Sequence, residues 1–158
     1  FIVDLTKHLK GNTLVLFQFV EKHGAVLYDM MKDLDRKVFY VWGGTDTQTR
    51  ENIREITEKE KSAIIVASYG TFSTGINIRN LHNVIFSSPS KSRIRVLQSI
   101  GRGLRQGTEK STATLYDIAD DFTYKSRQNF TLRHFMERIN IYNEEEFDYV
   151  IKNLKIEK

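Results

Sequence analysis

Short, nearly continuous hydrophobic runs punctuate this chain and predict its strands. Runs of this kind are typical of strands that are buried on both faces of a sheet. Apolar residues fill almost every position of the five runs, which cover residues 13–17, 37–41, 63–68, 84–87 and 113–118.

The segments between these runs have helical spacing of their apolar residues. We expect helices over 20–34, 47–61, 90–105 and 126–143, with Thr47 as a candidate N-cap of the second. The tail, residues 147–156, fits a strand or a helix. Strands that alternate with helices predict an α/β fold, a three-layer sandwich with a mainly parallel central sheet.

Small and hydroxyl-bearing residues follow three of the predicted strands. Gly43 and Gly44 follow the second, Tyr69 and Gly70 the third, and Ser87 with Ser88 the fourth. Open parallel sheets bind ligands outside the carboxyl ends of their strands. The sequence therefore places its candidate site at that edge.

Composition narrows the class of protein only slightly. A chain of 158 residues has the size of one domain. It has no cysteine, which excludes disulfides, thiol nucleophiles and Cys-ligated zinc. No run is long enough to span a membrane, and we expect a cytoplasmic protein without a membrane partner. The net charge of +4 permits nucleic-acid binding without requiring it. Because the chain starts at Phe1, we expect it to be part of a longer protein.

The segment 98–106 carries the most specific chemistry. On a helix, Gln98, Arg102 and Arg105 share one face, and two guanidinium groups there suit phosphate oxygens. Gly101 and Gly103 flank Arg102 and allow a close approach. The alternative is a basic surface helix.

A complete phosphate-binding loop is missing. Gly70 and Gly75 have the glycine spacing of such a loop, but Ile76 and Asn77 follow where lysine and a hydroxyl residue are needed. The hydroxyl-rich segment 68–77 fits contacts to a sugar-phosphate backbone, or an ordinary turn.

Trp42 and a group of aspartates each have two interpretations, and the histidines suggest no site. Trp42 either stacks on a base or ends a strand as a core residue. Asp117, Asp120 and Asp121 either bind a metal or form a solvated strand end, and we expect no metal ligands here. The four histidines show no metal-ligand spacing.

These motifs, in this order, resemble the second RecA-like domain of superfamily 2 helicases, and in particular a recombination and repair helicase. The resemblance covers residues 10–145. Residues 14–17 look like motif IV and 65–78 like motif V, while Trp42 to Thr45, followed by Arg50, resembles the loop and helix in between. The most specific match is 98–105, which resembles motif VI.

The resemblance implies a role for each matching residue. Arg105 would be the arginine finger, and Arg102 a second phosphate contact or an interdomain latch. Gln98, Gly75, Asn77 and Gly101 would lie near the nucleotide, although the family often has Asp where Asn77 stands. One strand of nucleic acid would follow a track lined by Gly43, Gly44, Thr45, Ser68, Tyr69, Gly70 and Thr71.

The same resemblance implies a divided active site. ATP with Mg²⁺ would be bound mainly by the first RecA-like domain of the same protein, which would be this chain's partner together with DNA or an RNA–DNA hybrid. Residues 1–10 would form an interdomain linker or helix, residues 1–158 the helicase C-terminal domain, and 144–158 a C-terminal extension. The isolated chain would not hydrolyse ATP. A non-catalytic RecA-like module that binds nucleic acid or a protein partner is the alternative, and a stand-alone nucleotide-binding enzyme is a third.

Overall fold

A computed structural model describes residues 1–75, 78–88 and 113–155 of the chain. They form two compact units, Phe1–Ala119 and Asp120–Lys158. The predicted C-terminal extension, 144–158, is part of the second unit.

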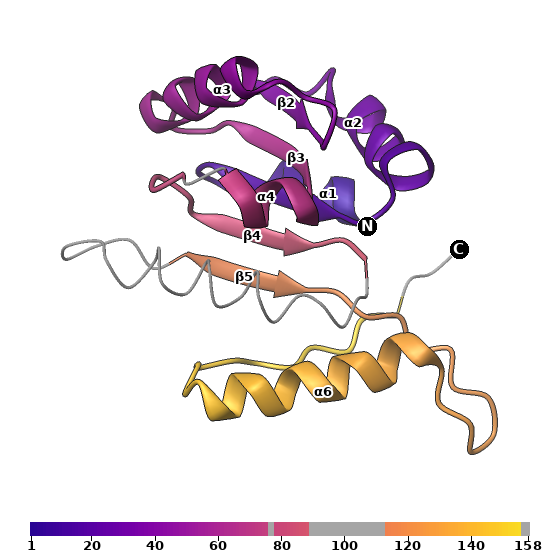
Figure 1. The fold of residues 1–158 in the computed structure, drawn as a ribbon. Coiled ribbons are helices and arrows are strands. Elements are labelled where there is room, and N and C mark those ends of the chain that lie inside the picture. The colour runs from indigo at the N-terminus through magenta and orange to yellow at the C-terminus, as the bar shows by residue number, and fades with distance from the viewer. Residues whose placement is uncertain (76–77, 89–112, 156–158) are drawn as a thin grey trace. The chain divides into compact units, whose positions relative to one another are not determined.

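The first unit is built on a parallel sheet of five strands in the order β2-β3-β1-β4-β5 (Figure 1). Every neighbouring pair is parallel. The strands are β1 (Thr13–Phe17), β2 (Val38–Val41), β3 (Ile64–Ser68), β4 (Asn83–Phe86) and β5 (Thr114–Asp117). Each lies within a residue or two of its predicted position, so the predicted sheet is confirmed.

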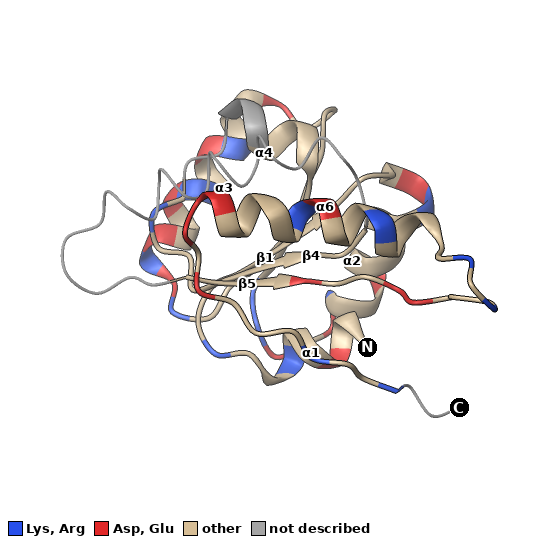
Figure 2. Ribbon diagram, turned by 90° about the horizontal axis from the view of Figure 1, so that it is seen from below, with Lys and Arg blue, Asp and Glu red and all other residues tan. Residues whose placement is uncertain are grey.

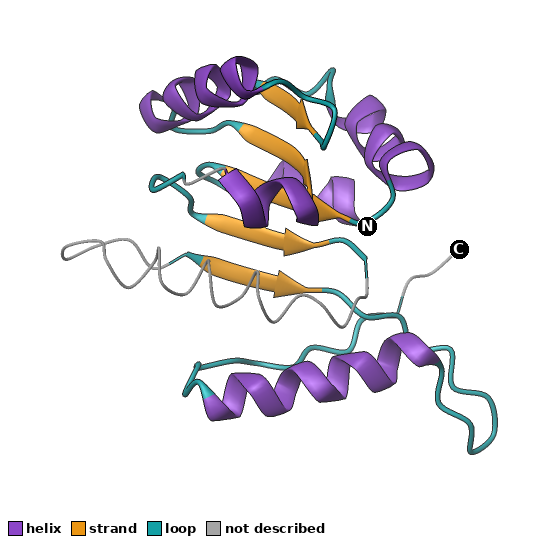
Figure 3. Cartoon of the chain, in the orientation of Figure 1, coloured by secondary structure: helices purple, strands orange, loops and turns teal. Residues whose placement is uncertain are grey.

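Helices cover both faces of this sheet. The first unit contains α1 (Ile2–His8), the π-helix η1 (Val20–Ala25), α2 (Val26–Met31), α3 (Thr47–Lys59) and α4 (Tyr69–Gly75) (Figure 3). Helices α3 and α4 lie on one face, and α1 and α2 on the other (Figure 2). The predicted three-layer α/β sandwich is therefore confirmed.

Alternate residues of the central strands point to opposite faces and build two apolar layers. Val15, Phe17, Ile64 and Val66 pack against Leu27 and Met31 of α2, with residues of α1 at the margin. The burial of these β-branched and aromatic side chains removes apolar surface from water and holds the helices against the sheet.

Two segments differ from their sequence predictions, and a third lies outside the comparison. The helix expected over 20–34 begins as a π-helix, where Gly24 lies directly against the ring of Phe17, and α2 ends at Met31. Residues 69–75, expected as a loop or turn, form α4, because the Ser68 hydroxyl accepts a hydrogen bond from the backbone N–H of Thr71. The helix expected over 90–105 lies outside the described residues.

The start of α3 also corrects the sequence prediction by one residue. Asp46, not Thr47, is the N-cap, and its carboxylate accepts hydrogen bonds from the backbone N–H and the hydroxyl of Thr49, at 2.9 and 2.6 Å. Asp is among the best N-cap residues because its oxygen satisfies an otherwise free amide.

Arg36 ties α1 to the amino edge of the sheet. Its guanidinium group donates hydrogen bonds to the carbonyl oxygens of Thr6 and Leu9, at 2.9 and 3.1 Å, and to that of Gly11, at 2.7 Å. Burial lowers the pKa of Arg36 from its usual value, although arginine keeps its charge. Most of residues 1–10, predicted as an interdomain linker or helix, thus forms α1, which is part of the first unit.

The second unit contains α6 (Phe130–Glu144). The helix starts four residues later than predicted, because Lys125 has a φ of 54° and Tyr124 forms a bridge with Arg127. The tail to residue 155 is neither strand nor helix. It packs on α6 through Tyr149, whose hydroxyl donates to the Asn143 side chain at 2.9 Å.

A helix long and apolar enough to cross a membrane is absent from the described part of the chain.

Candidate functional site

The carboxyl ends of four strands bring the predicted nucleic-acid residues to one edge of the sheet. The register pairs Phe17 with Ser68, Leu16 with Phe86, and Val41 with Ala67. The segment after β2, the start of α4 and the residues after β4 therefore emerge at the same edge, where the strand arrows end in Figure 1.

The segment after β2 is a tight, well-bonded loop. The backbone N–H of Thr45 donates to the carbonyl of Trp42 at 2.9 Å, and the N–H of Trp42 donates to the Thr45 hydroxyl at 3.0 Å. From the second turn of α3, Arg50 donates to the carbonyl of Gly43 at 3.1 Å. These bonds fix a loop in which Gly43 and Gly44 are exposed and Thr45 is half-buried.

At the end of β3, Ser68 and Thr71 are buried, whereas Gly70 is exposed. The hydroxyls of Ser68 and Thr71 lie 2.7 Å apart, and both side chains are buried, at 9% and 3% exposure. Tyr69 packs edge-on against Phe86 and donates to the carbonyl of Ser88 at 3.4 Å. Gly70 is exposed, and no atom lies within 4 Å of the position that a Cβ would take. Ser68 and Thr71 thus fix the start of α4, while the Cβ position of Gly70 faces open space.

Gly43, in the loop after β2, has the same open space beside it as Gly70. A Cβ on Gly43 would also meet nothing within 4 Å. Backbone without side chains allows a sugar-phosphate chain to approach closely, and such contacts position nucleic acid without reading its sequence.

Two buried serines, Ser87 and Ser88, directly follow β4, which lies on the other side of β1 from β3. The Ser87 hydroxyl donates to the carbonyl of Leu16 at 2.7 Å. The Ser88 hydroxyl is buried and has no hydrogen-bond partner among the described residues. The Ser87 side chain therefore links the ends of β1 and β4, and the Ser88 hydroxyl lies buried beside the candidate site.

The nucleotide-facing predictions fall almost wholly outside the described residues. Gly75 is the last residue of α4. The remaining ones, Asn77, Gln98, Gly101, Arg102 and Arg105, lie outside the described ranges.

Among the acidic residues at the end of β5 and after it, Asp121 has a local role. The carboxylate of Asp121 accepts hydrogen bonds from the backbone N–H and the hydroxyl of Thr123, which lower its pKa from the usual value. Within the described ranges, no group of three or more His, Asp or Glu side chains is arranged to hold a metal ion.

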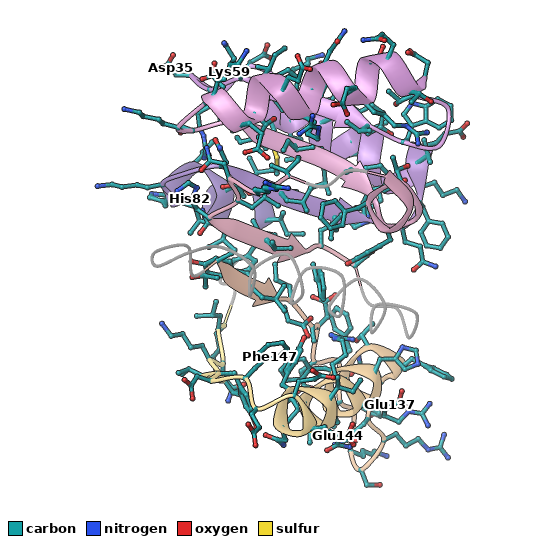
Figure 4. All side chains as sticks on the ribbon, turned by 60° about the vertical axis from the view of Figure 1, so that its left-hand side comes forward. Asp35, Lys59, His82, Glu137, Glu144 and Phe147 are labelled. Atoms are coloured by element: carbon teal, nitrogen blue, oxygen red, sulfur yellow. The ribbon has the colours of Figure 1, made fainter. Side chains whose placement is uncertain are left out.

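A cavity of about 560 Å³ opens at the opposite, amino edge of the sheet. Its lining includes Lys59 and His82, which lie on the same side of the first unit in Figure 4. None of the predicted site residues lines it. The cavity is thus separate from the candidate site.

Sequence reasoning missed how the loop after β2 is held. The sequence predicted no structural role for Asp46, and it assigned Arg50 only to a motif. The signal was present, since Asp46 precedes a helical segment and Arg50 stands one turn after it.

Comparison with known proteins agrees with this geometry. Residues 1–107 match the family model described as the helicase conserved C-terminal domain. The chain is 41% identical over 155 residues to the ATP-dependent DNA helicase UvsW of Enterobacteria phage T4, covering 92% of this chain and 31% of that protein. It is 29% identical over 112 residues to the putative ATP-dependent helicase IRC3 of Saccharomyces cerevisiae, covering 71% of this chain and 16% of that protein. The chain therefore spans less than a third of the length of these curated relatives.

Solved structures give the same result. The crystal structure of T4 UvsW matches with a TM-score of 0.80, covering 97% of this chain and 33% of that one. Domain 2 of the DEAD-box helicase Mss116p, 19% identical, has a TM-score of 0.54, which shows the RecA-like fold alone. From the matched family model, the sheet order and the resemblance of its motifs, we conclude that this chain belongs to the family of helicase conserved C-terminal domains.

Proposed function

We propose that this chain is the second motor domain of an ATP-dependent superfamily 2 DNA helicase that acts in recombination and repair. Its work would be the remodelling of branched DNA, including branch migration and the unwinding of DNA or RNA–DNA hybrids. The 41% identity to T4 UvsW supports this proposal, because that relative is named an ATP-dependent DNA helicase. The whole helicase is here called the parent protein, and its place of action would be the cytoplasm, that of the host cell if a phage encodes it.

The observation that carries the nucleic-acid role is a pair of glycines that face open space where two neighbouring strands, β2 and β3, end. Gly43 and Gly70 come from different strands, and neither has an atom within 4 Å of its Cβ position. One strand of nucleic acid would lie along the track Gly43, Gly44, Thr45, Ser68, Tyr69, Gly70 and Thr71. In this track Ser68 and Thr71 act as positioning residues, since their hydroxyls are buried against each other.

The ATP role rests on the resemblance of residues 98–105 to motif VI. ATP with Mg²⁺ would be held mainly by the first RecA-like domain of the parent protein. Arg105 would supply positive charge to the transferring phosphoryl group, with Arg102 as a second contact or latch. Gln98, Gly101, Gly75 and Asn77 would complete this side of the nucleotide site. ATP-driven opening and closing of the two domains would then move the track along the strand.

Substitution of the proposed finger in the parent protein tests this function. For Arg105→Ala we expect DNA-stimulated ATP hydrolysis to fall by roughly 10³-fold or more, because an arginine finger acts on the transition state. Steady-state phosphate release with saturating DNA measures this.

Arg54→Ala is the matched control. Arg54 is a half-buried arginine of α3, paired with Glu51 on its own helix and outside the proposed site, so its loss should leave the ATPase rate unchanged. If Arg105→Ala keeps the rate within about twofold of wild type, the finger assignment is wrong. The alternative, a non-catalytic RecA-like binding module, then takes its place.

A further inference from the structure

Trp42 presents its indole ring at the carboxyl end of β2, next to the proposed track. It follows Val41, which is completely buried, yet Trp42 itself is 40% exposed. Large aromatic side chains stabilise a fold most when they are buried. A ring left this open at a strand end therefore contributes little to the core.

The ring lies against the glycine two residues further on. A Cβ on Gly44 would stand 2.4 Å from Cη2 and 2.6 Å from Cζ2 of the indole, closer than any real contact. Only glycine leaves room for the ring in this position. The loop thus supports the six-membered part of the indole, while the adjacent Gly43 stays open.

The backbone beneath the ring is also held in advance. Both polar backbone groups of Trp42 are bonded, its N–H to the Thr45 hydroxyl at 3.0 Å and its carbonyl to the N–H of Thr45 at 2.9 Å. Arg50 adds a bond to the carbonyl of Gly43 and brings a positive charge to the loop. A ring on a fixed support loses little conformational freedom when a ligand stacks on it.

We propose that Trp42 stacks on an unpaired base of the strand that occupies the track. This inference rests on the proposed function, and it names a contact of another kind, to a base instead of the backbone. Every nucleobase has a π-face, so the contact tolerates any sequence and requires the base to be unstacked from a duplex. Its effect is to favour single-stranded over double-stranded nucleic acid at this edge.

Three variants of the parent protein separate stacking from bulk. Trp42→Phe keeps an aromatic face, whereas Trp42→Leu keeps apolar volume without one, and Trp42→Ala removes both. We expect Leu and Ala to weaken binding of single-stranded oligothymidine by roughly 5- to 150-fold, which corresponds to about 1–3 kcal/mol per stacked base, and Phe to retain most of the affinity. Fluorescence anisotropy of labelled oligonucleotide measures the affinity.

Two further readouts report on the contact itself. An abasic oligonucleotide of the same length should bind all four proteins equally, since it offers phosphates without bases. Trp42 is the one tryptophan of this chain. Its fluorescence is therefore the difference between the emission of wild type and that of Trp42→Phe. Oligothymidine should quench this difference, whereas the abasic strand should not.

The outcomes distinguish this proposal from the function on which it rests. Equal affinity of wild type and Trp42→Leu for oligothymidine, without quenching, overturns stacking and leaves the track in place. If the wild-type parent protein binds neither oligonucleotide, the nucleic-acid track itself is wrong, and stacking with it. Thermal unfolding of each variant confirms that it is folded when its affinity is measured.

Discussion

Single polar residues join elements that are far apart in this sequence, and Asn12 is the clearest case. Its side chain is completely buried just before β1. The amide nitrogen donates to the carbonyls of Thr57, Glu60 and Asn80, at 3.0, 2.8 and 2.8 Å, and the amide oxygen accepts from the N–H of Ala63 at 2.8 Å. Asn12 therefore satisfies backbone groups at the end of α3, the start of β3 and the segment before β4.

Because the amide of Asn12 faces three carbonyl oxygens, Asn12→Asp should be strongly destabilising. The substitution replaces the donating NH₂ group by a carboxylate oxygen, which cannot donate to these carbonyls and repels them. Buried polar groups that lose their hydrogen-bond partners lower the free energy of unfolding. We expect the free energy of unfolding to fall by about 3 kcal/mol or more, a large share of the stability of an ordinary domain. Denaturant titration of the chain followed by circular dichroism measures it.

The same chemical change at an exposed asparagine is the control. Asn52 lies on the surface of α3, where its side-chain oxygen accepts a hydrogen bond from Gln48 that an aspartate would also accept. Asn52→Asp should therefore unfold close to wild type. Similar midpoints for the two variants would show that the amide of Asn12 does not hold the backbone as described.

Among the elements, α3 connects stability with the candidate site, because it starts directly after the Trp42–Thr45 loop. Asp46 caps it, and the hydrogen bonds from the hydroxyl and the N–H of Thr49 hold the pKa of Asp46 below its ordinary value of 3.8. A carboxylate whose pKa is lower in the folded state stabilises the fold above its unfolded pKa. That contribution is lost as the pH falls through the folded pKa.

Asp46→Ala should therefore lower the thermal midpoint by a few degrees at neutral pH. The gap between the variant and wild type should close as the pH drops below 3.8, where the wild-type carboxylate takes up a proton. Thermal unfolding of both chains across this pH range measures it.

Asp46→Asn separates the charge from the cap, since asparagine caps equally well and does not titrate. It should match wild type at neutral pH and lack the additional loss below 3.8 that the wild-type cap shows. A gap between Asp46→Ala and wild type that stays constant with pH would contradict the role of the ionised carboxylate.

The elements also show what the sequence could and could not predict. The strands are confirmed because a continuous apolar run such as 64–68 has few other stable forms. Residues 69–75 were expected as a loop, and became helical through the Ser68 cap and the buried ring of Phe72. Serine and threonine are common both in turns and at helix N-caps, so the composition of this segment did not distinguish a turn from a helix. The hydrogen bonds of Asn12 and Arg36 join residues that are far apart along the chain. The spacing of apolar residues predicts local elements and not such long-range contacts.

For the molecule as a whole, the two edges of the sheet have different roles. At the amino edge, Arg36 and Asn12 fix the ends of helices and strands with buried hydrogen bonds. At the carboxyl edge, the Cβ positions of Gly43 and Gly70 face open space. Under the proposed function, these buried bonds would keep the first unit rigid while nucleic acid binds at the carboxyl ends of its strands.

The fold of α4 gives a physical reason to expect no ATP turnover from the isolated chain. A phosphate-binding loop wraps phosphates with free backbone N–H groups between a strand and a helix. Here the helix begins at Tyr69, directly after β3, so Gly70 to Gly75 lie within the helix and not in a loop. The purified 158-residue chain should therefore release no phosphate from ATP above the buffer rate, with or without DNA, while the parent protein in the same assay should. Turnover that copurifies with this chain, and persists in its Arg105→Ala variant, would mean that a nucleotide site independent of the proposed finger exists in it and that the divided active site is wrong.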